Sequence, residues 1–294
     1  MKRLICLLLA LSFVCPLVGC TQEKKDERMQ IVTTVFPLYD FANVLLDDCA
    51  NVRLLLPAGG DLHSYEPTPH DIAALSDADL ILCIGGEGEM HIQKILNSQK
   101  KENVLSFLEH FREETHEHDG HTHTDEHIWT SPKKAIRIFI LLAERLVTLV
   151  PEEKEAIEAR RDAYLTELQA LDASFAAYAK NAPTLIFGDS FPFHHLADDY
   201  DLNYLAAIDG CGEDSEPSAA RVGSLIDNAK KQNAKVIFYT ERTNDDLAKL
   251  IASPCGAETA RLHSCHNLSA AEYETGETYL SLMQQNLNTL NEAA

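Results

Sequence analysis

Residues 51–69 read Asn51-Val-Arg-Leu-Leu-Leu-Pro-Ala-Gly-Gly-Asp-Leu-His-Ser-Tyr-Glu-Pro-Thr-Pro69. The apolar start is typical of a buried parallel strand, and the Pro-Ala-Gly-Gly that follows ends it. His63 is therefore expected just past the carboxyl end of a strand, where open α/β sheets bind their ligands. Pro67 and Pro69 restrict the backbone after it, so this segment loses little freedom when a ligand arrives. His63 is a candidate metal ligand, and the alternative is an ordinary loop histidine.

Strand-like and helix-like segments alternate on both sides of this stretch. Apolar runs ended by glycine, proline or polar residues predict strands, and apolar positions at helical spacing predict helices. Such alternation is typical of a mostly parallel sheet with helices on both faces. The expected strands are 29–36, 51–56, 79–84 and 104–107, and the expected helices are 38–46, 71–75 and 91–96.

A helical region and a second alternating series follow. Ser131 and Pro132 are a favourable N-cap and first helical residue for a helix that continues to Val150, and a second helix is expected from Pro151 to about Tyr178. At roughly 1.5 Å per residue that helix would span about 40 Å, enough to bridge two lobes. Further strands are expected at 184–187, 204–208, 236–239 and 260–263, with helices at 191–199, 217–230, 245–251 and 270–290.

The predicted fold class is α/β, with two similar βα lobes joined by a long rigid helix and a metal site in the cleft between the lobes. The expected divisions are a signal peptide at 1–19, a lipid-anchored tether at 20–28, an N-terminal lobe at 29–150 with a His-rich loop at 110–127, a linking helix at 151–180, and a C-terminal lobe at 181–294.

The N-terminus indicates export. Two basic residues precede an apolar stretch too short for a stable membrane span, which is typical of a signal peptide. Leu17-Val-Gly-Cys20 resembles a bacterial lipobox, which implies cleavage before Cys20 and lipidation of that cysteine. The alternative is a plain secretory signal. We expect a protein anchored to the outer face of the cell membrane or located in the periplasm.

The charge balance argues against some partners. The chain has 25 basic and 46 acidic side chains in 294 residues, a formal net charge of −21. Nucleic acid and anionic surfaces are therefore not expected partners, because no excess of cations is present to displace counterions. Cationic ligands suit this chain better.

The histidines are concentrated. Six of the 13 lie between His110 and His127, interleaved with glutamate and aspartate. The segment from Thr115 to Thr124 has no apolar periodicity and predicts a mobile surface loop. Imidazoles beside carboxylates suit divalent ions, so we interpret the run as an auxiliary metal-collecting loop, the alternative being a solvated polar loop. Its histidines are His116, His118, His121 and His123.

His127 differs from these neighbours. Ile128 and Trp129, the only tryptophan, follow it directly, and a helix is expected to begin at Ser131. An imidazole on an anchored backbone loses less entropy when it coordinates a metal than one on a mobile loop. His127 is the stronger candidate for a defined site.

Together these segments resemble a known family. His63-Ser-Tyr-Glu-Pro-Thr-Pro69, the His-rich insertion, Asp125-Glu-His-Ile-Trp-Thr-Ser-Pro132 and the long central helix are similar to the ZnuA/TroA-like zinc or manganese substrate-binding lipoproteins of ABC transporters. The resemblance covers nearly the whole chain after the signal, although Glu126 stands where the family commonly has proline. It implies that His63 and His127 are metal ligands.

The resemblance also implies a function. A monomeric, lipid-anchored protein would capture Zn²⁺ outside the cytoplasm and deliver it to an ABC transporter permease. A manganese- or iron-binding member of the family and a metal-dependent adhesin are the alternatives.

The second lobe departs from the family pattern. The family usually has histidine or glutamate after the first strand of that lobe, and Asp189 stands near this place, with His194 and His195 as substitutes. The family's last ligand is an aspartate after a late strand, where this chain has His263, with His266 as the weaker candidate. Three or four imidazoles favour zinc over manganese or calcium, and copper remains compatible.

Five cysteines remain after the signal and Cys20, an odd number that leaves at least one thiol without a partner in the chain. We expect a disulfide between Cys211 and Cys265 that holds the loop after His263, with Cys49 and Cys83 as a weaker pair. The alternative for Cys265 is a thiolate ligand beside His263.

The chain is not expected to be an enzyme. It has no His-Glu-x-x-His, no Gly-x-Ser-x-Gly and no phosphate-binding glycine loop. A zinc hydrolase needs a carboxylate base beside an open metal position, and Glu66 is the only nearby candidate.

Overall fold

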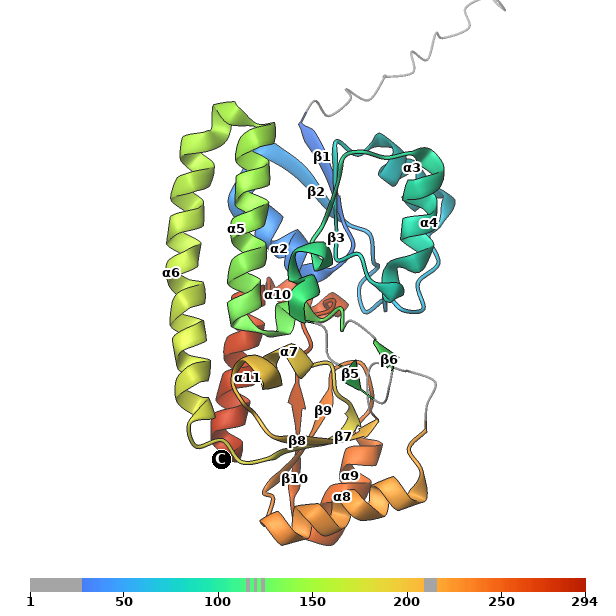
Figure 1. Ribbon diagram of the computed structural model, residues 1–294, viewed down its shortest axis with the longest axis vertical. Coiled ribbons are helices and arrows are strands. Elements are labelled where there is room, and N and C mark those ends of the chain that lie inside the picture. The colour runs from blue at the N-terminus through green and yellow to red at the C-terminus, as the bar shows by residue number, and fades with distance from the viewer. Residues whose placement is uncertain (1–27, 115–116, 119–120, 123–124, 209–215) are drawn as a thin grey trace, which may run out of the picture.

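The computed structural model describes residues 28–114, 117–118, 121–122, 125–208 and 216–294. Two parallel four-stranded sheets lie one above the other in Figure 1. The first lobe is the sheet β2-β1-β3-β4 with its helices. Its elements are β1 (Met29–Thr33), α2 (Phe36–Leu46), β2 (Ala50–Leu54), α3 (Pro69–Asp77), β3 (Leu80–Cys83), α4 (Met90–Gln99) and β4 (Val104–Ser106).

The second lobe repeats this plan with the sheet β10-β9-β7-β8. Its elements are β7 (Leu185–Ser190), α7 (His194–Asp199), β8 (Tyr204–Ile208), α8 (Ala219–Gln232), β9 (Val236–Thr240), α9 (Asp246–Ala252) and β10 (Glu258–Leu262). Every strand pair in both sheets is parallel. The predicted class, two βα lobes, is confirmed.

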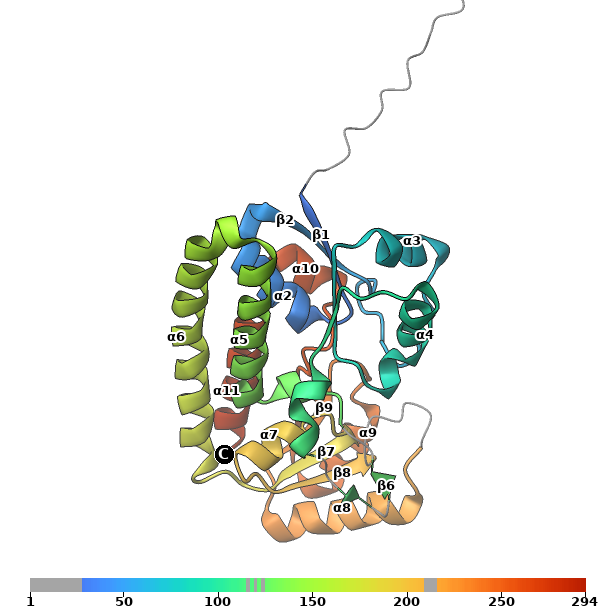
Figure 2. The ribbon, with the colours of Figure 1, turned by 45° about the horizontal axis from the view of Figure 1, so that its top comes forward.

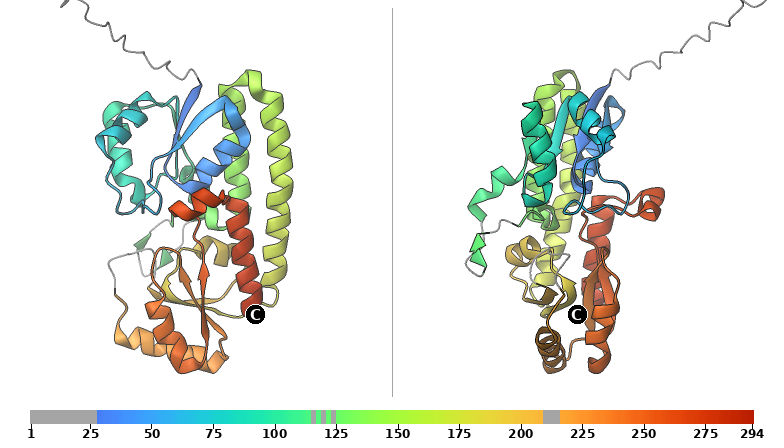
Figure 3. Two further views of the ribbon diagram at one scale, coloured as in Figure 1. Left: turned by 180° about the vertical axis from the view of Figure 1, so that it is seen from behind. Right: turned by 90° about the vertical axis from the view of Figure 1, so that its right-hand side faces the viewer.

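Two long helices flank both lobes. α5 (Pro132–Leu149) begins at Ser131, whose hydroxyl accepts a hydrogen bond from the backbone N–H of Lys134, and Pro132 opens the helix as predicted. α6 (Lys154–Ala179) runs back beside α5 and continues past it to the second lobe (Figures 1 and 3). The connection between the lobes is therefore a helix pair. Short 3₁₀ turns lie at 47–49, 87–89, 108–114, 128–130, 151–153 and 253–255.

The segment after β10 returns to the first lobe before α11 carries the chain back to end beside the second lobe (Figure 1). A single helix was expected over 270–290, but α10 (Ala270–Thr275) ends at Gly276, whose φ of +71° is left-handed, and α11 (Tyr279–Ala293) starts anew. α10 lies against α2, where the rings of Tyr39 and Tyr273 meet edge to face at 6.5 Å (Figure 2). The segment between β10 and α10 is thus placed between the lobes.

One apolar core joins both lobes to the long helices. It includes Ile31 of β1, Phe139 of α5, Leu168 of α6 and Phe187 of β7. Successive strand residues point to opposite faces, so Ile186, the neighbour of Phe187, packs instead into a smaller core under α8 and α9. Because the lobes share one core, the residues at their junction have a well-defined environment.

The histidine-rich segment contains a short strand pair. Part of the segment 115–124, expected to be a mobile loop, forms a short antiparallel pair, β5 (Glu117–His118) with β6 (His121–Thr122). Its residues 115–116, 119–120 and 123–124 lie outside the described residues.

Across the described ranges, no helix combines the length and apolarity that a membrane crossing requires.

Candidate metal centre

Three histidines from distant parts of the chain meet between the lobes. His63 lies in the loop between β2 and α3, His127 directly before the 3₁₀ turn that leads to α5, and His266 between β10 and α10. One ring nitrogen from each lies within 4.8 Å of the other two. Within the described parts of the chain, no other three histidine, cysteine or acidic side chains form such a group. The distances suit three ligands around one ion.

The loop of His63 is held by its neighbours in sequence. The backbone N–H of His63 donates to Asp61 Oδ1 at 2.8 Å. Thr68 caps α3, and Asp71 returns a hydrogen bond to the backbone of Thr68 in a capping box. A Cβ atom on Gly88 would lie 2.7 Å from His63 Nδ1, so only glycine allows this turn to approach the ring. The imidazole is thereby fixed before any ligand arrives.

Asp125 orients His127. Its Oδ1 lies 2.7 Å from His127 Nδ1 and accepts the backbone N–H of His127 at 3.0 Å. A carboxylate at Nδ1 favours the tautomer whose lone pair is on Nε2, an arrangement common among metal-binding histidines. The indole of Trp129 packs 5.2 Å from the His127 ring and 5.7 Å from that of His266.

His266 is held by the first lobe. Its carbonyl accepts the backbone N–H of Phe36 at 3.1 Å, and its Nε2 accepts that of Leu62 at 3.4 Å. Asn267 donates to the carbonyls of Pro57 and Gly60 at 2.7 and 2.9 Å. The third histidine is thereby fastened to the loop that carries the first.

The electrostatic state of the rings suits a cation. Burial, with a smaller contribution from His127, lowers the pKa of His63 to about 4, and burial also holds the pKa of His266 well below its usual value. Both rings are therefore neutral at physiological pH, the form that binds metals. His63 Nε2 and His266 Nδ1 are buried without a hydrogen-bond partner. A divalent ion would satisfy both atoms.

His263 is not placed with the cluster, a correction to the expected ligand set. Its Nδ1 accepts the backbone N–H of Cys265 at 2.9 Å, and its Nε2 lies 3.5 Å from Glu272 Oε1. Asn286 of α11 bonds both its backbone N–H and its carbonyl at 2.7 Å. Cys265 has a left-handed φ of +58°. The chain turns there, and His266 instead of His263 faces the first-lobe histidines.

Asp189 is also absent from the cluster. Its Oδ2 accepts the backbone N–H of Thr240 at 3.2 Å and the hydroxyls of Thr240 and Thr243 at 2.6 Å each. Its Oδ1 accepts the backbone N–H of Ser190 at 2.7 Å. The carboxylate joins β7 to β9 and the loop after β9, so its acceptor sites serve the second lobe.

The substitutes His194 and His195 contact Asp125. His194 Nδ1 lies 3.0 Å from Asp125 Oδ2, and His195 Nε2 lies 2.9 Å from the Asp125 carbonyl. The partner carboxylate of His127 was missed in the sequence. Its spacing, two residues before a candidate ligand, is the signal that could have identified it.

Glu126, which replaces the proline common in the family, is buried beside the site. Its Oε1 accepts the backbone N–H of Gly88 at 2.6 Å, and its Oε2 has no hydrogen-bond partner. Through its hydrogen bond to Gly88, Glu126 fastens this turn to the segment that carries His127. Burial raises the pKa of the Glu126 carboxyl to about 7.

The cysteine expectations need correction. Cys49 and Cys83 both carry free thiols, so the predicted disulfide between them is absent. Cys265 also carries a free thiol, and its predicted partner, Cys211, lies outside the described residues. Burial holds the pKa of the Cys265 thiol well above its usual value, which also argues against a thiolate ligand. Cys265 lies inside the core, with its Sγ 3.7 Å from the carbonyl of His263.

Several predicted residues cannot be placed in this way. Cys20, His116 and His123 lie outside the described residues. His118 and His121 are register partners in the β5–β6 pair.

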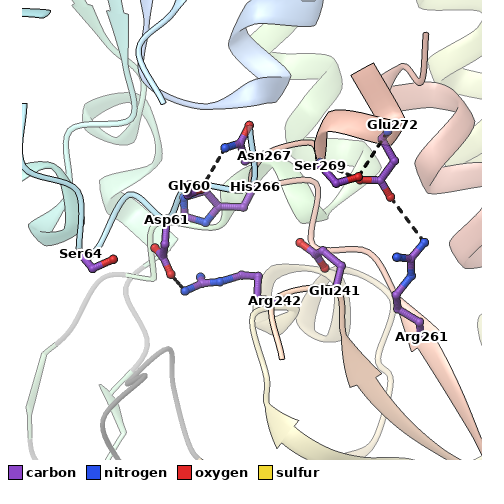
Figure 4. Close-up of a pocket in the computed structure, with 11 residues that line it drawn as sticks. Gly60, Asp61, Ser64, Glu241, Arg242, Arg261, His266, Asn267, Ser269 and Glu272 are labelled. Atoms are coloured by element: carbon purple, nitrogen blue, oxygen red, sulfur yellow. Dashed lines mark hydrogen bonds and ion pairs between the residues drawn. The ribbon is translucent and has the colours of Figure 1, made fainter. Parts of the chain in front are cut away.

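A cavity of about 360 Å³ borders the cluster, with His266 as part of its wall (Figure 4). Its charged side chains are mixed in sign, and an ion pair between Asp61 and Arg242 crosses it from one lobe to the other. Its other charged residues are Glu241, Arg261 and Glu272. The cavity provides a polar space next to the three rings.

Comparison with known proteins shows extensive similarity. The family model described as "Zinc-uptake complex component A periplasmic", ZnuA, matches residues 31–293. The zinc-binding lipoprotein AdcA of Streptococcus pneumoniae is 34% identical over 99% of this chain, and the match spans 61% of the relative, so the chain corresponds to about three-fifths of that protein.

Two further matches cover most of both chains. The high-affinity zinc uptake system protein ZnuA of Bacillus subtilis is 32% identical over 92% of this chain and 89% of its own length. The crystal structure of the Zn(II)-bound ZnuA-like domain of Streptococcus pneumoniae AdcA superposes with a TM-score of 0.74 and 31% identity, covering 90% of this chain and 98% of that domain.

Proposed function

Because this chain belongs to the ZnuA family of zinc-uptake components, we propose that it captures a zinc ion outside the cytoplasm and delivers it to the permease of an ABC importer. His63, His127 and His266 hold the ion. The observation that carries the proposal is the meeting of one half-buried and two buried imidazoles, with one nitrogen each within 4.8 Å of the others. His263 and Asp189 are not part of the proposed ligand set.

The donor set supports zinc as the cargo. Zinc is bound in tetrahedral sites by imidazole nitrogen, whereas manganese, calcium and magnesium prefer more oxygen ligands. Three histidines leave one tetrahedral position for a water molecule or another donor. The nearby carboxylates of Asp125 and Asp61 contribute negative charge without occupying the site, which offsets the cost of burying a divalent cation.

Capture and release follow from the origin of the ligands. Two come from loops of the first lobe, and the third comes from the segment that enters from β10 of the second lobe. An ion bound by all three links these segments, so any contact that draws the β10–α10 segment away weakens binding. We infer that docking on the permease has this effect.

The setting of the protein completes the proposal. We propose an exported, lipid-anchored monomer attached through Cys20, which acts as a binding protein and not as an enzyme. The His-rich segment 110–127 would raise the local zinc concentration near His127, to which it leads directly in the sequence.

A binding measurement tests the proposal. The purified protein should bind one zinc ion tightly in competition with a chromophoric chelator. His63→Ala should abolish the tight site, whereas His91→Ala, which changes an exposed histidine of α4, should leave it unchanged. A wild-type protein that binds no zinc tightly, or a His63→Ala variant that binds as tightly as wild type, would contradict the proposal.

A further inference from the structure

Two of the proposed ligands are preceded by the same local arrangement. Asp61-Leu-His63 and Asp125-Glu-His127 both have an aspartate two residues before the histidine. In each, Oδ1 of the aspartate accepts the backbone N–H of the histidine, at 2.8 Å for His63 and 3.0 Å for His127. Two loops that are unrelated in position therefore present their ligand through the same turn.

The second carboxylate oxygen of each aspartate is contacted from the other lobe. Arg242, two residues after β9, forms an ion pair with Asp61 Oδ2 (Figure 4). His194, the first residue of α7, places Nδ1 3.0 Å from Asp125 Oδ2. Each aspartate thus contacts a first-lobe ligand with one oxygen and a second-lobe side chain with the other.

These contacts are partly shielded from water. The aspartate side chains are 14% and 15% exposed, and their second-lobe partners 18% and 20%. Electrostatic contacts that are partly buried are screened less than contacts at the surface.

We propose that Asp61 and Asp125 couple the two lobes to the metal site, so that Arg242 and His194 of the second lobe are positioning residues for His63 and His127. The inference rests on the proposed zinc-binding function. It gives Arg242 and His194 of the second lobe a role in zinc binding although neither is a ligand.

The coupling should be reciprocal, and it should be stronger through Asp125 than through Asp61. If the second-lobe contacts hold the ligands in place, zinc binding and these contacts stabilise each other, because the coupling between two sites is reciprocal. Asp61 accepts a hydrogen bond from the backbone of His63, whereas Asp125 contacts both the backbone and the ring of His127. Loss of His194 should therefore weaken zinc binding more than loss of Arg242.

The test uses full-length variants that preserve local packing. His194→Phe removes the contact to Asp125 but keeps an aromatic ring beside Phe191 and Tyr204, which lie 5.1 and 5.5 Å from the His194 ring. Arg242→Met keeps the aliphatic part of the side chain. His194→Gln and Arg242→Lys are the conservative variants, since both retain a donor.

Arg261→Met is the matched control. Arg261 lines the same cavity as Arg242, but its ion pair is with Glu272 of α10 instead of either aspartate. Zinc affinity is measured by chelator competition and the ligand field by the visible absorption of the Co²⁺-loaded protein. The unfolding of each metal-free variant is measured in parallel, to separate positioning from a general loss of stability.

We expect His194→Phe to weaken zinc binding roughly 10- to 100-fold and Arg242→Met about 10-fold, up to the loss usually seen when an outer partner of a metal site is removed. The Co²⁺ spectrum of His194→Phe should change, the conservative variants should recover part of the affinity, and Arg261→Met should match wild type. If wild type binds one zinc ion tightly and both His194→Phe and Arg242→Met bind equally tightly with unchanged Co²⁺ spectra, the coupling is refuted while the proposed function stands. Failure of wild type to bind zinc would refute both.

Discussion

The edges of the two lobes that face each other carry similar residue types but differ in how those residues are bonded. At the first lobe, His63 has a buried nitrogen without a hydrogen-bond partner. At the second lobe, Asp189 accepts hydrogen bonds from Thr240 and Thr243. Nδ1 of His263 accepts one from the backbone of Cys265, and its buried Nε2 lies 3.5 Å from Oε1 of Glu272. A residue of the right type near the end of a strand is a candidate ligand, and its hydrogen bonds decide whether it can serve as one.

The largest difference is expected between two histidines three residues apart, His263 and His266. His266→Ala removes a proposed ligand and should weaken zinc binding by more than about 100-fold, beyond the usual effect of losing only a partner of a ligand. His263→Asn should bind zinc like wild type, because its side-chain oxygen can still accept the backbone N–H of Cys265.

Chelator competition measures both variants. The opposite result, with zinc binding lost in His263→Asn and kept in His266→Ala, would restore the ligand set expected from the sequence.

A smaller effect is expected at the second-lobe edge. Asp189→Ala leaves the three donors on Thr240 and Thr243 without their buried acceptor, which should lower the free energy of unfolding by about 3 kcal/mol. Zinc affinity of the folded protein should change little. Urea unfolding and chelator competition on the same preparation separate the two quantities, and a large loss of affinity in the folded variant would make this edge part of the metal site.

The smallest predicted effect depends on pH at the first-lobe edge. The folded-state pKa of His63 is lowered to about 4 by burial, so the unfolded chain binds more protons at this residue below pH 6.5. Its contribution is fully present above pH 6.5 and is lost as the pH falls toward 4, amounting to about 2 kcal/mol between pH 7 and pH 5.

Unfolding of the metal-free protein at the two pH values measures this loss. His63→Gln should lose correspondingly less stability over the same interval. An equal loss in both proteins would mean that the His63 ring is already charged or solvated in the folded state.

Much of the fold was predictable because it depends on local patterns. The apolar runs ended by glycine and proline identified the strands, and Ser131 with Pro132 identified the start of α5. The break between α10 and α11 at Gly276 was missed, since glycine inside a helical pattern can be tolerated and ends a helix only when it adopts the left-handed conformation.

The candidate site was predictable only in its first-lobe part. His63 and His127 stand beside proline or aromatic residues that fix the nearby backbone, and this can be seen in the sequence. The choice between His263 and His266 depends on the φ of Cys265, and the state of Asp189 depends on two threonines about fifty residues away. Neither is encoded in a local pattern.

The position of the Trp129 indole allows metal binding to be followed by fluorescence. Its Nε1–H donates to the carbonyl of Ser264 at 2.9 Å, so the ring is fixed in place against two of the three imidazoles. Since the chain has a single tryptophan, its fluorescence reports on one location without an added label. Loading and unloading can then be followed in real time from the intrinsic emission, with a paramagnetic ion such as Cu²⁺ as a quencher.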